Sequence, residues 1–265
     1  MMKLNNIEYE INSKIWKSDS FINSNIPFIF NDEIIEYDMK EAGFSLTKEY
    51  KLLDEDLIKK LSKYKKERRT IELGLIQRNN EEYRNSLKQA FAEARSKFFI
   101  ANNIDITDLI SIKKDAIFTK KLCRHNEFGR YILFRPKNYY TSYIQLGNRL
   151  ECYYNPNKLD IKGIGEDNTK LHEEYMIKFI KSFIRKMETE KPEVVIDFTK
   201  RFITQYKRKE LEVEYYRSFN HESCYRLIDE ESEDIFYDYW EEYKDELDIS
   251  YNFHNVLLKL IQIPL

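Results

Sequence analysis

The chain is poor in glycine, proline and cysteine, and it has no long apolar run. Its 6 glycines are too few for most glycine-rich phosphate loops, and they form neither a dinucleotide fingerprint nor a nucleophile elbow. Three cysteines leave one unpaired in any disulfide scheme, and no Cys-x-x-Cys occurs, which indicates a reducing compartment. The apolar runs are too short to span a bilayer and the N-terminus lacks a secretory leader pattern, so we expect a cytoplasmic protein with no membrane partner.

What the chain does contain is aromatic and charged side chains, at 15% and 34% of its residues, which is typical of a folded domain. The excess of Asn, Ile, Lys and Tyr suggests an AT-rich genome, such as that of a phage or mobile element. The net charge is only −2, but residues 59–69 are strongly basic and residues 229–248 strongly acidic. The basic segment suits a polyanion, and the acidic, aromatic stretch 235–243 suits a protein partner.

Hydrophobic periodicity predicts an α+β fold in two parts. Residues 1–165 mix strands with helices: a hairpin or two successive strands in 27–38, a helix capped by Asp54, a helix over 65–77, and a longer helix with an apolar stripe from Tyr83 to Phe98. Short β-like runs follow up to residue 162. Residues 166–265 read as helical, with Pro192 in the first turn of one helix. We therefore expect an antiparallel sheet crossed by helices, followed by a helical segment.

Two aspartates lie where the predicted strands end. Asp38 leaves an apolar strand and enters a helix, and Asp115 lies at the tip of a hairpin predicted over residues 109–121. Two strand-borne carboxylates suffice to hold Mg²⁺ or Mn²⁺ for phosphoryl transfer, and cations such as Lys65 and Arg69 would neutralise the phosphates. Such a site requires the hairpin to pair beside the strand ending at Asp38. The plainer interpretation is that each Asp caps a turn or helix and that the lysines form a solvated face.

Several segments resemble the motifs of template-directed DNA polymerases of families A and B, in the order that those enzymes have. Residues 37–46 resemble motif A, residues 69–74 resemble motif B, and residues 114–119 resemble motif C. Residues 140–143 and 159–164 resemble the segments that follow motif C in family B. The resemblance implies a palm over residues 1–165 and a thumb-like segment over 166–265.

The resemblance also implies roles for individual residues. Asp38 and Asp115 would be the catalytic residues and the metal ligands for Mg²⁺ or Mn²⁺. Lys65 and Arg69 would bind the phosphates of the incoming nucleotide. Primer-template DNA would be the partner, contacted by a further set of lysines: Lys113, Lys114 and Lys162. The implied function is that of a Mg²⁺-dependent nucleotidyltransferase or small DNA polymerase, of phage origin.

Other functions remain open. Lys113 stands where motif C of family B has its first Asp, which favours a catalytically inactive, polymerase-derived module that binds nucleic acid or a replication complex. A phage interaction or structural protein, using the acidic stretch 235–243, is a third possibility. A zinc site would need Cys123 and His125 together with His221 and Cys224, but the Cys-x-His spacing is too short for a usual zinc knuckle.

Overall fold

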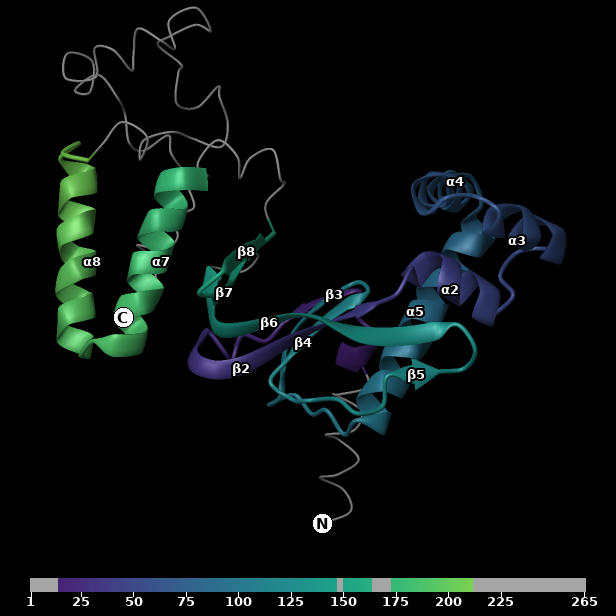
Figure 1. Cartoon of the computed structure of the whole chain (residues 1–265), viewed down its shortest axis with the longest axis horizontal. Coiled ribbons are helices and arrows are strands. Elements are labelled where there is room, and N and C mark those ends of the chain that lie inside the picture. The colour runs from purple at the N-terminus through teal and green to yellow at the C-terminus, as the bar shows by residue number, and fades with distance from the viewer. Residues whose placement is uncertain (1–13, 147–149, 164–172, 212–265) are drawn as a thin grey trace, which may run out of the picture. The chain divides into compact units, whose positions relative to one another are not determined.

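The computed structural model describes residues 14–146, 150–163 and 173–211 of the chain. It confirms the α+β class, with an antiparallel sheet and helices that pack on it (Figure 1). In chain order the elements are β1 (Ser20–Ile22), β2 (Phe28–Met39), α2 (Ala42–Glu49), α3 (Glu55–Ser62), α4 (Lys66–Asn79), α5 (Glu81–Ala101), β3 (Leu109–Lys113), β4 (Ala116–Thr119), β5 (Glu127–Phe128), β6 (Ile132–Leu146), β7 (Leu150–Asn155), β8 (Lys158–Lys162), α7 (Glu173–Thr189) and α8 (Pro192–Lys207).

Within these described ranges, eight strands form one sheet in the order β1-β3-β4-β2-β6-β7-β8, with β5 paired to β6. The order is not sequential, because β3 and β4 insert between β1 and β2 after the four helices α2 to α5. This return of the chain brings β4 beside β2 in antiparallel register. Segments about 80 residues apart therefore meet at one place in the sheet.

Contacts divide the chain into two compact units. Unit 1 contains the chain up to Ile26 together with Glu33–Tyr140, and unit 2 contains Pro27–Asp32 together with the chain from Thr141. The division differs from the one expected between residues 165 and 166, because α7 and α8 share a hydrophobic core with β6, β7 and β8 rather than packing by themselves.

The core of unit 1 lies between one face of the sheet and α5. The predicted stripe of this helix, Tyr83, Leu87, Phe91, Ala94 and Phe98, is buried throughout. Phe98 packs against Tyr37 of β2 and Phe134 of β6, with ring centroids 5.3 Å and 4.5 Å away. Because side chains alternate along a strand, burial of Tyr37 on this face turns Glu36 and Asp38 to the other face.

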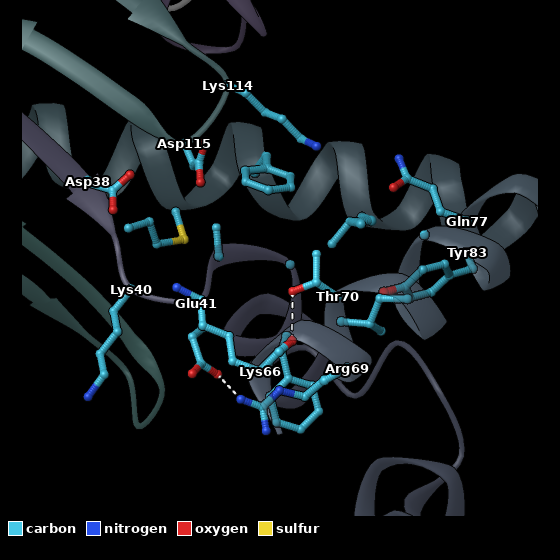
Figure 2. A pocket seen from close by; sticks show the side chains of 18 of the residues that line it. Asp38, Lys40, Glu41, Lys66, Arg69, Thr70, Gln77, Tyr83, Lys114 and Asp115 are labelled. Carbon is cyan, nitrogen blue, oxygen red and sulfur yellow. Dashed lines mark hydrogen bonds and ion pairs between the residues drawn. The ribbon is translucent and has the colours of Figure 1, made fainter. Parts of the chain in front are cut away.

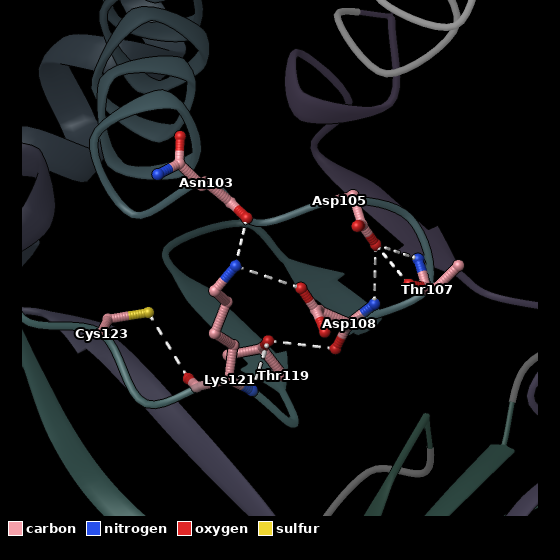
Figure 3. Close-up of polar contacts among 7 residues, drawn as sticks. All are labelled: Asn103, Asp105, Thr107, Asp108, Thr119, Lys121 and Cys123. Atoms are coloured by element: carbon pink, nitrogen blue, oxygen red, sulfur yellow. Dashed lines mark hydrogen bonds and ion pairs between the residues drawn. The ribbon is translucent and has the colours of Figure 1, made fainter.

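Residues 109–121 form the predicted hairpin of β3 and β4, beside the strand that ends at Asp38. Polar contacts tie its open end, as Figure 3 shows. The Asp105 carboxylate accepts backbone hydrogen bonds from Thr107 (2.7 Å) and Asp108 (3.2 Å), and the Thr119 hydroxyl donates to the Asp108 carbonyl (3.0 Å). These contacts fix the hairpin at the end opposite to Asp115.

The tip of the hairpin is held by a buried arginine. Arg95 of α5 has a side chain with no exposed surface, and it donates hydrogen bonds to the backbone carbonyls of Lys114 (2.7 Å), Trp16 (3.1 Å) and Lys17 (3.1 Å). Its guanidinium also pairs with Asp19 at 3.0 Å. Lys114 has a left-handed backbone (φ 55°), so this turn is one that its neighbours must hold in place.

Two predicted turns are absent because the strands run through them. Residues 27–38 do not form a hairpin or two strands; β2 is continuous, and Asn31 takes a left-handed conformation (φ 54°) within it. Asn tolerates this conformation at low cost, so it bends a strand as readily as it ends one. Likewise, β6 is a single strand of 15 residues where the sequence predicts separate short β-like runs. In both cases the long strand passes from one unit to the other.

Unit 2 buries the apolar faces of α7 and α8 against β6, β7 and β8. Phe179 stacks on Phe198 and packs at a tilt against Phe202, with ring centroids 5.8 Å and 3.9 Å away. Ile144 and Cys152 belong to the same core. The two helices run beside each other in Figure 1, joined by a short turn before Pro192. In the ranges that the structure describes, no helix combines the length and the apolar character needed to cross a bilayer.

Replacing Arg95 by Met tests the hold on the hairpin. Met keeps much of the apolar stem but leaves three carbonyls and Asp19 without their donor, so the free energy of unfolding should fall by about 3 kcal/mol in a urea titration. Arg84→Met on the same helix is the control. Its partner Glu81 is 3.7 Å away and both side chains are exposed, so the expected change is below about 0.5 kcal/mol. Equal losses in the two variants would show that Arg95 does not anchor the turn.

Candidate functional site

A cavity of about 530 Å³ opens in unit 1 between the ends of β2 and the β3–β4 hairpin, the start of α2, and α4 and α5. Figure 2 shows its lining side chains, with Asp38, Asp115 and Lys114 at one end and Lys66, Arg69 and Gln77 along α4. Its wall combines apolar and charged side chains. The charged residues are Asp38, Lys40, Glu41, Lys66, Arg69, Lys114, Asp115 and Arg135.

The structure brings Asp38 and Asp115 together. Asp38 of β2 lies opposite Ala116 of β4, so Asp115 is the next residue beyond this pair. A backbone hydrogen bond of 3.1 Å from the Met39 N–H to the Asp115 carbonyl continues the ladder past the end of the strand. Both carboxylates line the cavity and lie near each other at one end of it in Figure 2. This is the arrangement that a shared metal site requires.

The surroundings of Asp38 disfavour the ionised form of its carboxyl group. Burial raises the pKa of its carboxyl group above the ordinary value, Lys137 opposes the shift, and the nearby carboxylates of Asp115 and Glu36 raise it further. The Lys137 Nζ lies 3.7 Å from the Asp38 Oδ1 and 3.7 Å from the Glu36 Oε1. Arg135 also lowers the pKa of Asp38, by a smaller effect, but the pKa stays raised, and such a group of carboxylates is suited to binding a cation.

Glu36 is a third carboxylate on this face, and sequence reasoning missed it. It is buried (2% exposed) two residues before Asp38, and its Oε2 accepts hydrogen bonds from the Asn138 side chain at 2.5 Å and from the Tyr140 hydroxyl at 3.0 Å. These donors hold the carboxylate within the sheet, and Glu36 does not line the cavity. Its charge still acts on Asp38. An acidic residue alternating with apolar ones in a strand was the signal available for it.

One face of α4 forms part of the cavity wall. Lys66, Arg69, Thr70, Leu73, Gly74 and Gln77 line the cavity. Their spacing of three and four residues is that of a single helical face. Arg69, as predicted, is among them, but its Nη2 lies 2.5 Å from the Glu41 Oε2 and its guanidinium covers the Phe44 ring. Lys66 forms no ion pair with a carboxylate in the part of the chain that the structure describes, and Arg135 of β6 adds another cation at the rim.

Three predicted lysines lie outside the cavity wall. Lys65 precedes the first turn of α4, so the cavity-facing position falls to its neighbour Lys66. Lys113 is half-buried in β3, while Lys114 at the turn does line the cavity. Lys162 belongs to β8 in unit 2, where its Nζ is 3.8 Å from Asp160. Of residues 59–69, Lys66 and Arg69 line this cavity.

Two helical glycines keep the wall open. Gly43 of α2 and Gly74 of α4 line the cavity, and a Cβ built at either position would meet nothing within 4 Å. Glycine inside a helix costs about 1 kcal/mol relative to alanine. Neither position needs glycine for packing, since nothing crowds it. The cavity therefore has free space along α4, which a side chain would otherwise occupy.

The residues present fit Mg²⁺ if phosphate oxygens and water supply its other ligands. In the described ranges, no three His, Cys, Asp or Glu side chains are grouped closely enough to hold a metal by themselves. Mg²⁺ is commonly bound by one or two carboxylates together with phosphate oxygens and water, and Asp38 with Asp115 matches that pattern. For zinc, Cys123 is buried and unpaired, while His221 and Cys224 lie outside the described residues, as does the predicted partner surface 235–243.

The polymerase resemblance proved wrong. A family model described as Bacteriophage PBS1 gene 130 protein matches residues 11–265, and no polymerase family matches. No curated protein matches the chain. The predicted relation to phage is confirmed by the family. The motifs misled because a strand ending in Asp and a hairpin with an Asp at its tip are short features that many antiparallel sheets contain.

The stability of Asp38→Asn without metal tests the electrostatics of the site. A carboxyl group with a raised pKa holds its proton more tightly in the folded protein, so stability falls as the pH rises through the pKa of the folded state. Asn removes this cost. At pH 7 the metal-free Tm of the variant should equal or exceed that of the parent, and the difference should shrink as the pH is lowered toward about 4.

Asp19→Asn is the matched control for this measurement. It removes the carboxylate that pairs with Arg95, so its Tm should fall at pH 7. If Asp38→Asn also melts lower than the parent at pH 7, Asp38 acts as a structural cap and the strained carboxylate pair is refuted.

Proposed function

The chain belongs to the Bacteriophage PBS1 gene 130 protein family, and we propose that it is a Mg²⁺-dependent nucleotidyltransferase acting on nucleic acid. One observation carries the proposal: Asp38 and Asp115, from strands far apart in the sequence, meet in the wall of a cavity that is also lined by five cationic side chains and one further carboxylate, Glu41. Carboxylates alone would serve a metal, and cations alone an anion. Their combination in one cavity suits a metal bound together with phosphate groups.

The chemistry divides among the residues by charge. A Mg²⁺ ion held between Asp38 and Asp115 would polarise the phosphoryl group and position the attacking hydroxyl. Lys66, Lys114 and Arg135 are placed to neutralise the phosphate oxygens. Replacing one of these cations by a neutral residue should weaken phosphate binding, because phosphate recognition depends on the charge.

Lys137 acts as a counter-ion within this site. Its ammonium group balances Asp38 and Glu36 when no metal is present, at 3.7 Å from each. Because it reaches Asp38 from β6 with a side chain that is 47% exposed, it can move into solvent without disturbing the core. Asp38 is then available to a divalent cation. Among the described residues, no lysine forms an ion pair of this kind with Asp115.

A second function is favoured by a different observation. Lys137 already supplies a cation to Asp38, and the described residues offer no third metal ligand. A protein with these properties could bind the phosphates of nucleic acid through Lys66, Lys114 and Arg135 without transferring a nucleotide. This is the binding module that the sequence left open. It differs from the enzyme in needing neither Mg²⁺ nor the Asp115 carboxylate.

Transfer of a labelled nucleotide separates the two functions. The parent is incubated with Mg²⁺ or Mn²⁺, a nucleoside triphosphate labelled on its α-phosphate, and either primed or single-stranded DNA or RNA. We expect incorporation by the parent and a fall of about 100-fold or more in Asp115→Asn, which keeps the shape of the side chain but removes the charge that the metal needs. Asp56→Asn, at a fully exposed position on α3, is the control and should retain activity.

Absence of incorporation by the parent on all four nucleic acids, with DNA binding that is unchanged by EDTA and by Asp115→Asn, would refute the enzyme and support the binding module. Loss of incorporation in Asp56→Asn as well as in Asp115→Asn would indicate a general effect of charge rather than a metal site.

A further inference from the structure

A second cavity adjoins the first within unit 1. It has a volume of about 420 Å³ and lies between α2 and the segment that joins β5 to β6. Lys40 and Glu41, which follow Asp38 at the end of β2, line both cavities. The two spaces are therefore neighbours on either side of one short stretch of backbone. Glu41 has a left-handed conformation (φ 47°) at this boundary, just before α2 begins.

The central side chain of the second cavity is Lys48. Its Nζ lies 4.1 Å from the centroid of the Tyr131 ring and 4.8 Å from that of Phe44, so two aromatic faces position it. No carboxylate forms an ion pair with it in the described part of the chain. Burial lowers the pKa of Lys48, and the nearby Arg69 lowers it further. An ammonium group in this position gains by meeting an anion.

The opposite wall is also cationic and is firmly held. Arg130 lies with its guanidinium 5.3 Å from the Tyr131 ring, on the same ring that Lys48 contacts. The Glu49 carboxylate accepts the backbone N–H groups of Arg130 and Tyr131, both at 2.8 Å. It also fills the space beside Gly129, where a Cβ would lie 2.0 Å from its Oε1. The turn that carries Arg130 is thus tied to α2.

The charges in this cavity do not balance. Lys40, Lys48 and Arg130 face two carboxylates, Glu41 and Glu127. Glu41 is already engaged by Arg69 at 2.5 Å. The Glu49 carboxylate, beside the wall, is occupied by the backbone N–H groups of Arg130 and Tyr131. Among the lining residues, Glu127 therefore remains as one exposed carboxylate against three cations, and two of these cations are positioned by ring contacts. A site of this kind selects a compact, multiply charged anion.

We propose that the Lys48 cavity binds the distal phosphates of a polyphosphate ligand, such as a nucleoside triphosphate whose reacting phosphate lies at Asp38 and Asp115. The identity of this ligand rests on the proposed function, while anion binding at Lys48 does not. The shared wall at Lys40 and Glu41 allows one extended chain of phosphates to contact both cavities. Lys48 and Arg130 would then bind the β- and γ-phosphates, which leave as pyrophosphate when the α-phosphate is transferred to the attacking hydroxyl.

Calorimetric titration with inorganic tripolyphosphate in the presence of EDTA tests the site without its metal. We expect Lys48→Gln and Arg130→Gln each to weaken binding by about tenfold, which is the loss of one charged hydrogen-bonding partner. Lys88→Gln is the matched control, because Lys88 is exposed on α5 and lines neither cavity. It should bind as the parent does. Arg130→Gln keeps the backbone bond to Glu49, so it remains informative if Lys48→Gln does not fold.

The outcomes separate this inference from the proposed function. A loss of tripolyphosphate affinity in Lys48→Gln supports the second cavity even if the parent transfers no nucleotide. The inference is overturned, whatever the transfer assay gives, if Lys48→Gln and Arg130→Gln both bind tripolyphosphate as the parent does, or if the parent does not bind it. A titration with single-stranded DNA forms the second arm. The inference is also overturned if the variants bind single-stranded DNA more weakly but bind tripolyphosphate as the parent does. The cavity would then hold the phosphodiester backbone of a nucleic acid.

Discussion

The pairing of β4 with β2 is the constraint on which the candidate site depends. It sets Asp38 opposite Ala116 and thereby places Asp115 one residue beyond the end of the ladder. A shift of one residue in this register would turn Asp38 into the core beside Phe98 and Tyr37 to the outer face. The register is held by burial of Tyr37 on one side and by Arg95 at the tip of the hairpin. The positions of the two carboxylates are therefore consequences of packing.

The electrostatics of the site follow from the same arrangement. The outer face of β2 carries Glu36 and Asp38, and the hairpin tip adds Asp115, so negative charge accumulates at the edge of the cavity. α4 and β6 bring positive charge from the other sides. Part of this charge is already neutralised, as in the pairs of Arg69 with Glu41 and of Lys137 with Asp38. The cavity thus carries carboxylates and cations together, with Lys114 beside the carboxylate pair and Lys66 and Arg69 along α4.

The sequence was sufficient for the elements whose signal is local. The apolar stripe of α5 and the proline that begins α8 were predicted correctly, because each signal lies within its own helix. Asp54 occupies the predicted N-cap position of α3, but its side chain makes no capping hydrogen bond. The hairpin at 109–121 was also predicted, because its turn and its apolar strands are adjacent in the chain. The ends of strands leave a weaker local signal in the sequence. At Asn31 the backbone bends without leaving the sheet, and local composition does not distinguish that bend from a turn.

The parts of the site that sequence reasoning missed depend on contacts between distant segments. Lys66 rather than Lys65 faces the cavity because α4 begins one residue later than expected. Arg135 and Lys137 belong to β6. This strand is far from β2 in the sequence and lies next to it only because of the order of strands in the sheet. Arg95 did leave a signal, since it lies four residues after Phe91 in the buried stripe of α5. A charged residue in that phase indicates a buried polar network. The polymerase resemblance misled because it was built from short motifs and took no account of the family to which the whole chain belongs.

The most direct test of the central claim is to locate a metal ion experimentally. Crystals of the protein with Mn²⁺ and a non-hydrolysable nucleoside triphosphate would reveal the ion by its anomalous scattering. The account predicts an anomalous peak within coordination distance of both the Asp38 and Asp115 carboxylates, at about 2.0–2.3 Å, with a phosphate oxygen completing the site. A bound nucleotide whose Mn²⁺ contacts neither aspartate, or an ion held by other side chains, would contradict it.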